Sequence, residues 1–172
     1  SMSKLMLIYI VFERLQNKTL TTDQEFLVSK KAWKFGGSKM FVNIGDMVSV
    51  ENLLQGIIIQ SGNDACIVLA EGLSGTEENM VDEMNEKAVE IGLTNSNFQN
   101  VTGWPHENHY MSLRDIANLS KLIINNFPES KIIVMDRDPI SLLFSNAIRI
   151  SSYKDSNNNF LFNDFSKRLL KL

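Results

Sequence analysis

The longest apolar run in this chain is LMLIYIVF, from Leu5 to Phe12, and the rest of the molecule is expected to pack around it. Good helix formers at Glu13–Gln16 extend the run and favour a helix of about 15 residues over a strand. Because such a helix is apolar on every side, it needs burial on every side. We therefore predict that it forms the central helix of the core.

The same run is too short to cross a membrane, since a transmembrane helix needs about 20 apolar residues. No basic segment precedes the run and no small-residue cleavage site follows it. A basic leading segment and a small-residue cleavage site are typical of signal peptides, so we expect no signal peptide in the chain as it stands.

The composition is that of an ordinary globular protein, with 44% hydrophobic and 22% charged residues among 172. It predicts one domain over residues 1–172. The net charge of −3 provides no basic field for a phosphate backbone, so we do not expect nucleic-acid binding. Cys66 is the only cysteine, which excludes an intramolecular disulfide and a C-x-x-C metal site. We expect no metal and no cofactor.

N-capping residues and helix stops predict four helices beyond the central one. They run from Val50 to Gln60 after Ser49, from Ala65 to Leu73 after Asp64, from Glu77 to Ile91 before Gly92, and from Ser112 to the residue before Pro128. Short strands are predicted at Glu25–Ser29, Met40–Val42, Lys131–Met135 and Ser141–Ile150. The turn Gly36-Gly37 separates the first two, and Ser151–Asn159 is interpreted as a loop.

A first candidate for chemistry is the pair Ser1 and Lys4. Residues three apart share one face of a helix, so a hydroxyl and an amine can meet there. Burial disfavours the charged form of lysine, and a neutral Lys4 would act as a base for Ser1. The helix N-terminus also favours a developing anion. The alternative is a chance S-x-x-K match.

A second candidate is the polar break Gln60–Asp64 between two apolar helices. A turn between two core helices is held rigidly, and its side chains can point into a shared cleft. The alternative is an ordinary turn in which Asn63 or Asp64 only caps a helix.

Three further features favour structural readings. His106 and His109 are interpreted as surface loop residues, since no third ligand cluster accompanies them. Cys66 lies in an apolar segment and is interpreted as a buried, inert thiol. Six carboxylates are interpreted as a solvated helix face: Glu77, Glu78, Asp82, Glu83, Glu86 and Glu90.

Taken together, S-x-x-K at Ser1–Lys4 and S-x-N at Ser61–Asn63 resemble the motifs of the penicillin-recognising serine enzymes. The flanks resemble more narrowly the D-alanyl-D-alanine carboxypeptidases, the low-molecular-mass penicillin-binding proteins. The similar segments are Ser1–Met6, Met40–Val42, Gly45–Val50, Gly56–Cys66, Met84-Asn85, Gly92–Asn95, Phe98–Asn100, Gly103–Pro105 and Ser112–Asp115. The resemblance covers about Ser1 to Phe127 and fades beyond it.

The resemblance implies a role for each matching residue. Ser1 would attack the terminal D-Ala-D-Ala bond of a peptidoglycan stem peptide, and Lys4 would take its proton. Ser61 would pass a proton to the leaving amine, and Asn63 would hold the amide side of the substrate. β-Lactams would acylate Ser1 as covalent inhibitors. The location would be the periplasm or cell envelope.

The resemblance also implies an α/β (α+β) fold of the β-lactamase/transpeptidase type. The family's third motif, K-T-G, is absent from the 172 residues, as is Lys-Ser-Gly. The family places sheet strands before the S-x-x-K helix, whereas here Ser1 is the first residue. We therefore expect a partial domain, mainly the helical subdomain with short β pieces and an incomplete sheet. Apolar surface left uncovered would favour a homodimer.

The missing K-T-G keeps a second function open: a catalytically inactive remnant that acts as a binding or interaction module. A third alternative is an N-terminal nucleophile, in which Ser1 uses its own amine as the base.

Overall fold

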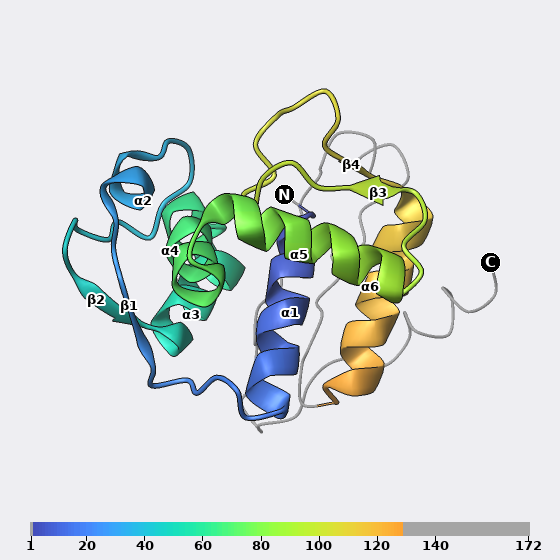
Figure 1. The fold of residues 1–172 in the computed structure, drawn as a ribbon, viewed down its shortest axis with the longest axis horizontal. Helices are drawn as coiled ribbons and strands as arrows, with labels where there is room; N and C mark the ends of the chain where they lie inside the picture. The colour runs from blue at the N-terminus through green and yellow to red at the C-terminus, as the bar shows by residue number, and fades with distance from the viewer. Residues whose placement is uncertain (1, 129–172) are drawn as a thin grey trace, which may run out of the picture.

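The computed structural model describes residues 2–128 (Figure 1). Helix α1 (Lys4–Gln16) occupies the centre and is buried from Lys4 to Val11. Helix α5 (Glu77–Glu90) crosses one face of α1, and α6 (Leu113–Asn126) runs beside it. The predicted central helix is therefore confirmed. The strands predicted at Lys131–Met135 and Ser141–Ile150, the loop Ser151–Asn159 and the side chain of Ser1 lie outside the described residues.

Helices α3 (Val50–Gln60) and α4 (Asn63–Ser74) form the second half of the helical body and pack against each other. The predicted bounds of α3 are confirmed, because the Ser49 hydroxyl accepts the N–H of Asn52 at its start. Ser112 caps α6 in the same way, by accepting the N–H of Asp115. Within residues 2–128, no helix is both long enough and apolar enough to cross a membrane.

Two short antiparallel ladders complete the described part. Strand β1 (Glu25–Leu27) pairs with β2 (Met47–Ser49), with Phe26 opposite Val48. Strand β3 (Ser96–Asn97) pairs with β4 (Tyr110–Met111). A short helix, α2 (Lys30–Lys34), follows β1 and was not predicted, because five residues are too few for a helical period to show.

The predicted strand at Met40–Val42 is wrong. Its three backbone N–H groups point to the carboxylate of Asp64 and not to a neighbouring strand. Strand β1 therefore pairs with the later segment Met47–Ser49, and the Gly36-Gly37 turn does not close a hairpin.

The ladder β1–β2 is fixed to the helices through close packing at Gly72 of α4. A Cβ added there would lie 2.2 Å from the ring carbon Cγ of Phe26, so only glycine admits the ring. On the far side of α1, Phe127 makes edge contacts with Tyr9 and Phe12, at centroid distances of 5.8 and 5.3 Å. Both contacts hold α1 between its neighbours.

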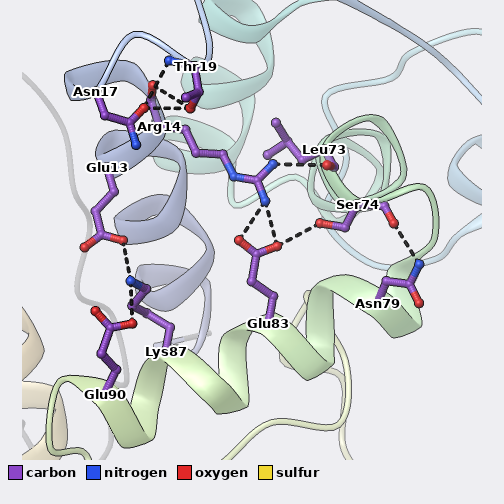
Figure 2. A network of polar contacts seen from close by, with 10 residues as sticks. All are labelled: Glu13, Arg14, Asn17, Thr19, Leu73, Ser74, Asn79, Glu83, Lys87 and Glu90. Carbon is purple, nitrogen blue, oxygen red and sulfur yellow. Dashed lines mark hydrogen bonds and ion pairs between the residues drawn. The ribbon is translucent and has the colours of Figure 1, made fainter.

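The interpretation of the α5 carboxylates as one solvated face is wrong for two of the six. Glu77 is buried and pairs with Lys31 at 2.8 Å. Glu83 is half-buried and accepts two hydrogen bonds from Arg14 of α1 (Figure 2). The other four are exposed. The helical period alone could not separate them, because the partners Lys31 and Arg14 come from distant segments.

Candidate active site

The candidate site forms where the start of α1 meets the turn between α3 and α4. Lys4 is the first residue of α1, Ser61 ends α3 and Asn63 begins α4. The Lys4 ammonium nitrogen Nζ lies 3.0 Å from Ser61 Oγ and 2.7 Å from Asn63 Oδ1, and it also donates to the Ser61 carbonyl. Three of the four residues predicted from the motifs are therefore in contact, and the fourth, Ser1, lies three positions before Lys4.

Lys4 sits in an environment that disfavours its charge. Its side chain is buried, and among residues 2–128 no carboxylate forms an ion pair with it. Burial lowers the pKa of Lys4, while Cys66 and Asp64 of α4 oppose that shift when ionised. Burial also raises the pKa of Cys66 to about 12, so this thiol is neutral at neutral pH. The prediction that Cys66 is buried is confirmed.

The three acceptors around Lys4 differ in one chemical respect. The Ser61 carbonyl and Asn63 Oδ1 can only accept, whereas the Ser61 hydroxyl can donate or accept. A charged Lys4 donates to all three. A neutral Lys4 has two N–H bonds for the two carbonyl oxygens, and its lone pair is then free to accept from the hydroxyl of Ser61. The hydrogen-bond group therefore accommodates both protonation states of Lys4.

Ser61 itself has an uncommon backbone conformation. Its φ of 56° and ψ of 37° are left-handed, a region that non-glycine residues seldom occupy. This conformation ends α3 and lets the N–H of Gly62 reach the carbonyl of Gly56 at 3.0 Å. Such strain persists only where the surroundings fix it, and it is concentrated at functional sites.

Asn63 is oriented by the loop that follows α2. Its backbone N–H donates to the Ser38 carbonyl at 2.7 Å, and its side-chain Nδ2 donates to the Gly36 carbonyl at 2.9 Å. With Nδ2 held in this way, Oδ1 faces Lys4. Gly37 has a φ of +79°, and a Cβ on it would lie 2.7 Å from Asn63 Nδ2 and 3.1 Å from a ring carbon of Trp104. The Gly36-Gly37 pair thus lets the loop backbone come close to the side chain of Asn63.

Trp104 forms part of the rim near this glycine pair. The indole comes from the loop between β3 and β4 and makes an edge contact with Phe35, with centroids 5.4 Å apart. It remains half-exposed, at 48%. An aromatic wall therefore lies beside the loop that orients Asn63.

The prediction that Asp64 caps a helix is wrong. Gly62 is the N-cap of α4 and makes no side-chain bond, while Asp64 lies inside the first turn and is fully buried. Its carboxylate accepts hydrogen bonds from the Met40 and Phe41 amides at 3.0 Å each. The sequence offered one signal for this: an acid directly before the apolar run Ala65–Ala70 must find buried donors.

The histidine pair lies apart from these groups. His106 is exposed as predicted, but His109 is half-buried, so the prediction of a surface residue is wrong for it. His109 Nδ1 accepts the Gln99 N–H at 3.1 Å, and its ring packs edge-on against Phe98. Burial lowers the pKa of His109, with a smaller contribution from His106. No group of three potential metal ligands occurs within residues 2–128.

Comparisons with known proteins show which family this chain is similar to. A sequence model described as D-alanyl-D-alanine carboxypeptidase matches residues 1–169, so the similarity extends beyond the predicted limit near Phe127. The carboxypeptidase DacF of Bacillus subtilis is 40% identical over 124 residues, which are 72% of this chain and 32% of that protein. The chain thus spans about a third of the length of the curated relatives it matches.

Two solved structures of similar proteins share the fold of this chain. The D-alanyl-D-alanine carboxypeptidase DacD from Francisella tularensis has a TM-score of 0.73 and 42% identity, covering 75% of this chain and 31% of that one. Penicillin binding protein 5 from Haemophilus influenzae has a TM-score of 0.72 and 34% identity, covering 79% and 42%. The predicted transpeptidase-like fold class, present here as a mostly helical part, is confirmed.

Proposed function

Because this chain belongs to the D-alanyl-D-alanine carboxypeptidase family, we propose that it supplies the nucleophile and proton-transfer groups of a serine carboxypeptidase. The substrate would be a peptidoglycan stem peptide ending in D-Ala-D-Ala, in the periplasm or cell envelope. The observation that carries the proposal is the buried hydrogen-bonded group of Lys4, Ser61 and Asn63.

In the first step, Ser1 Oγ attacks the carbonyl carbon of the terminal peptide bond while Lys4 takes the hydroxyl proton. The lowered pKa of Lys4 supports this role, since only the neutral amine has a lone pair for the proton. Ser1 stands three residues before Lys4 in the S-x-x-K motif, and the family resemblance assigns the nucleophile to that position. A β-lactam would acylate Ser1 by the same step.

In the second step, the carbon–nitrogen bond breaks and the leaving D-alanine amine needs a proton. Ser61 would supply it: its hydroxyl can donate to the amine and regain a proton from Lys4, whose Nζ lies 3.0 Å from Ser61 Oγ. Water then attacks the acyl-enzyme and releases the shortened peptide, which restores the Ser1 hydroxyl.

Asn63 can still form a hydrogen bond with the substrate, although both polar atoms of its side-chain amide already make hydrogen bonds within the protein. Oδ1 accepts from Lys4 and has a second lone pair, while Nδ2 donates to Gly36 and has a second hydrogen. That second hydrogen would bind an amide carbonyl of the stem peptide. Asn63 would thus orient the substrate without leaving Lys4.

The absence of K-T-G argues for slow turnover by these 172 residues. The resemblance implies that K-T-G lies on a strand of the cleft. Its lysine would bind the substrate carboxylate, and the strand would supply one oxyanion-hole amide. Losing one such donor costs about 10²–10³ in rate. The second candidate function, a catalytically inactive module that binds stem peptides, stays open for these residues.

Release of D-alanine from a D-Ala-D-Ala pentapeptide separates the two functions. The carboxypeptidase predicts release by the wild type and none by S1A, with Ser120→Ala on α6 as the matched serine control. Saturable binding of the peptide without release would establish the inactive module instead. Acetylating the N-terminal amine tests the third alternative, since activity that survives acetylation rules out the amine as base.

A further inference from the structure

We propose that Asp64 is a positioning residue of the candidate active site, because its carboxylate fixes the loop that orients Asn63 beside Lys4. The catalytic meaning of this inference rests on the proposed function, whereas the geometry does not. Nothing in the S-x-N motif itself assigns a role to the residue after the asparagine.

The carboxylate of Asp64 collects four backbone N–H groups. Oδ1 accepts from Met40 at 3.0 Å and from Ala65 at 2.9 Å, and Oδ2 accepts from Phe41 at 3.0 Å and Val42 at 3.4 Å. Three of these donors belong to one loop segment. Hydrogen bonds to an ionised acceptor are about twice as strong as neutral ones, so the carboxylate replaces the strand partner that Met40–Val42 lacks.

The held loop is strained at its centre. Phe41 has a φ of 64°, a left-handed conformation that a bulky aromatic residue rarely adopts, and its side chain is 81% exposed. Packing of the ring therefore does not hold the backbone there. The hydrogen bonds from the backbone N–H groups of Met40, Phe41 and Val42 to the Asp64 carboxylate are positioned to do so.

The same loop then orients Asn63 from its other end. Ser38 accepts the backbone N–H of Asn63, and Gly36 accepts its side-chain Nδ2. Asn63 Oδ1 in turn receives the Lys4 N–H at 2.7 Å. Asp64 is thus connected to Lys4 through the loop and Asn63, and loss of its acceptors would loosen each of these contacts.

Asp64 also acts on Lys4 through its charge. The ionisable groups that face Lys4 are Asp64 and Cys66, both from α4. Burial raises the pKa of the Cys66 thiol to about 12, so at neutral pH the interaction to consider is the one between Lys4 and the carboxylate of Asp64. This carboxylate favours the protonated form of Lys4 and so limits how far burial lowers the pKa of that lysine.

The test compares D64N with D115N in the full 172-residue chain. Asp115 is a matched control, because it too is buried in the first turn of a helix and accepts loop donors, from the Asn95 N–H at 2.8 Å and the Ser96 hydroxyl at 2.7 Å. The Lys4 side chain is titrated by NMR in protein with labelled lysine, and amide hydrogen exchange is followed at Met40 and Phe41.

The proposal predicts that D64N moves the Lys4 titration midpoint to lower pH and speeds exchange at Met40 and Phe41. D115N should change neither. Equal midpoints in all three proteins would overturn the proposal. If D64N does not fold, exchange in the wild type decides: Met40 and Phe41 amides that exchange as fast as exposed loop amides would overturn it, and protection comparable to α4 would support it.

Acylation by benzylpenicillin in the same samples separates this inference from the proposed function. A shifted Lys4 midpoint in D64N without acylation of the wild type would refute the function and leave the positioning role standing. Acylation of both wild type and D64N with one common pH profile would refute the positioning role and leave the function standing.

Discussion

Lys4 is the residue on which the proposed chemistry depends. A side chain with a long apolar stem lies buried at the head of α1, with its amine among three neutral oxygen acceptors. Two effects compete in the pKa of Lys4: desolvation by burial, which disfavours the charged form, and the attraction of Cys66 and Asp64 when these are ionised, which favours it. Desolvation is the larger for the pKa of Lys4, which is lowered from the ordinary 10.5.

This shift predicts the pH dependence of acylation. If neutral Lys4 takes the proton of Ser1, the acylation rate rises with pH as Lys4 loses its own proton. Because burial lowers the pKa of Lys4, the midpoint of that rise should fall below 10.5. Stopped-flow penicillin acylation between pH 6 and about 11 measures it.

Lys4→Arg tests the same residue by keeping the charge permanent. A guanidinium stays protonated at all accessible pH values, so acylation should fall by about 10² or more at each of them. Lys34→Arg, on the exposed face of α2, is the control and should leave the rate unchanged. Full activity of K4R would remove Lys4 from the role of base.

Gly37→Ala tests the close approach to Asn63. Gly37 and Gly45 both have positive φ, at 79° and 85°, but only Gly37 has atoms where a Cβ would sit. Gly45→Ala should therefore cost about 1 kcal/mol of unfolding free energy from backbone strain alone. G37A should cost about 1–3 kcal/mol more because of the contact with Asn63. Urea unfolding of both variants measures the difference, and equal losses would contradict the packing described.

The sequence predicts the identity of Lys4, Ser61 and Asn63 through their motifs, but not how their polar atoms are shared. The role of Asp64 was missed because an aspartate before a helix is ordinarily a cap. Here the acid follows the cap and binds a loop 22 to 24 residues earlier. Local spacing carries no information about a partner at that separation.

At the scale of elements, the longer helices with local capping signals were predictable, as was the position of β1 within the predicted strand Glu25–Ser29, but the partner of β1 was not. Helix α3 begins after Ser49 and α6 after Ser112, as local rules require. The pairing of β1 with β2 depends on tertiary contacts instead, among them Phe26 against Gly72 and the loop held by Asp64. Three-residue strands are too short for alternation to reveal such a pairing.

The contact between α1 and α5 depends on an ion pair that the helical pattern did not reveal. Arg14 donates to both carboxylate oxygens of Glu83 at 2.7 Å and to the Leu73 carbonyl at 3.0 Å, and the Ser74 hydroxyl also donates to Glu83 (Figure 2). One carboxylate thus joins α1, the end of α4 and α5. This geometry fixes the far end of the helix that begins with Lys4.

Glu83→Gln is expected to lower the free energy of unfolding by about 1–2 kcal/mol, because it removes the charge from a half-buried ion pair in which Arg14 Nη2 donates to both carboxylate oxygens. Glu86→Gln, an exposed change of the same kind on α5, should stay within about 0.5 kcal/mol of the wild type. Urea unfolding at low and high salt measures both. Equal stability of the two variants would show that the pair contributes nothing.

At the scale of the molecule, residues 2–128 form a helical body with two short ladders and exposed apolar side chains. Leu113, Phe41 and Val89 are each at least 80% exposed. Apolar exposure of this kind favours association, so the predicted homodimer remains a prediction. Sedimentation velocity should show a dimer fraction that grows with concentration, and a monomer at all concentrations would contradict it.

The sharpest single test of the proposed chemistry is the mass of the folded protein after incubation with benzylpenicillin. Opening of the β-lactam ring expels no leaving group, so acylation adds the whole mass of the drug. The proposal predicts one adduct, located on Ser1 by peptide mapping and absent from S1A. A folded wild-type protein that gains no mass, or carries the adduct elsewhere, would contradict the assignment of Ser1 as nucleophile and Lys4 as its base.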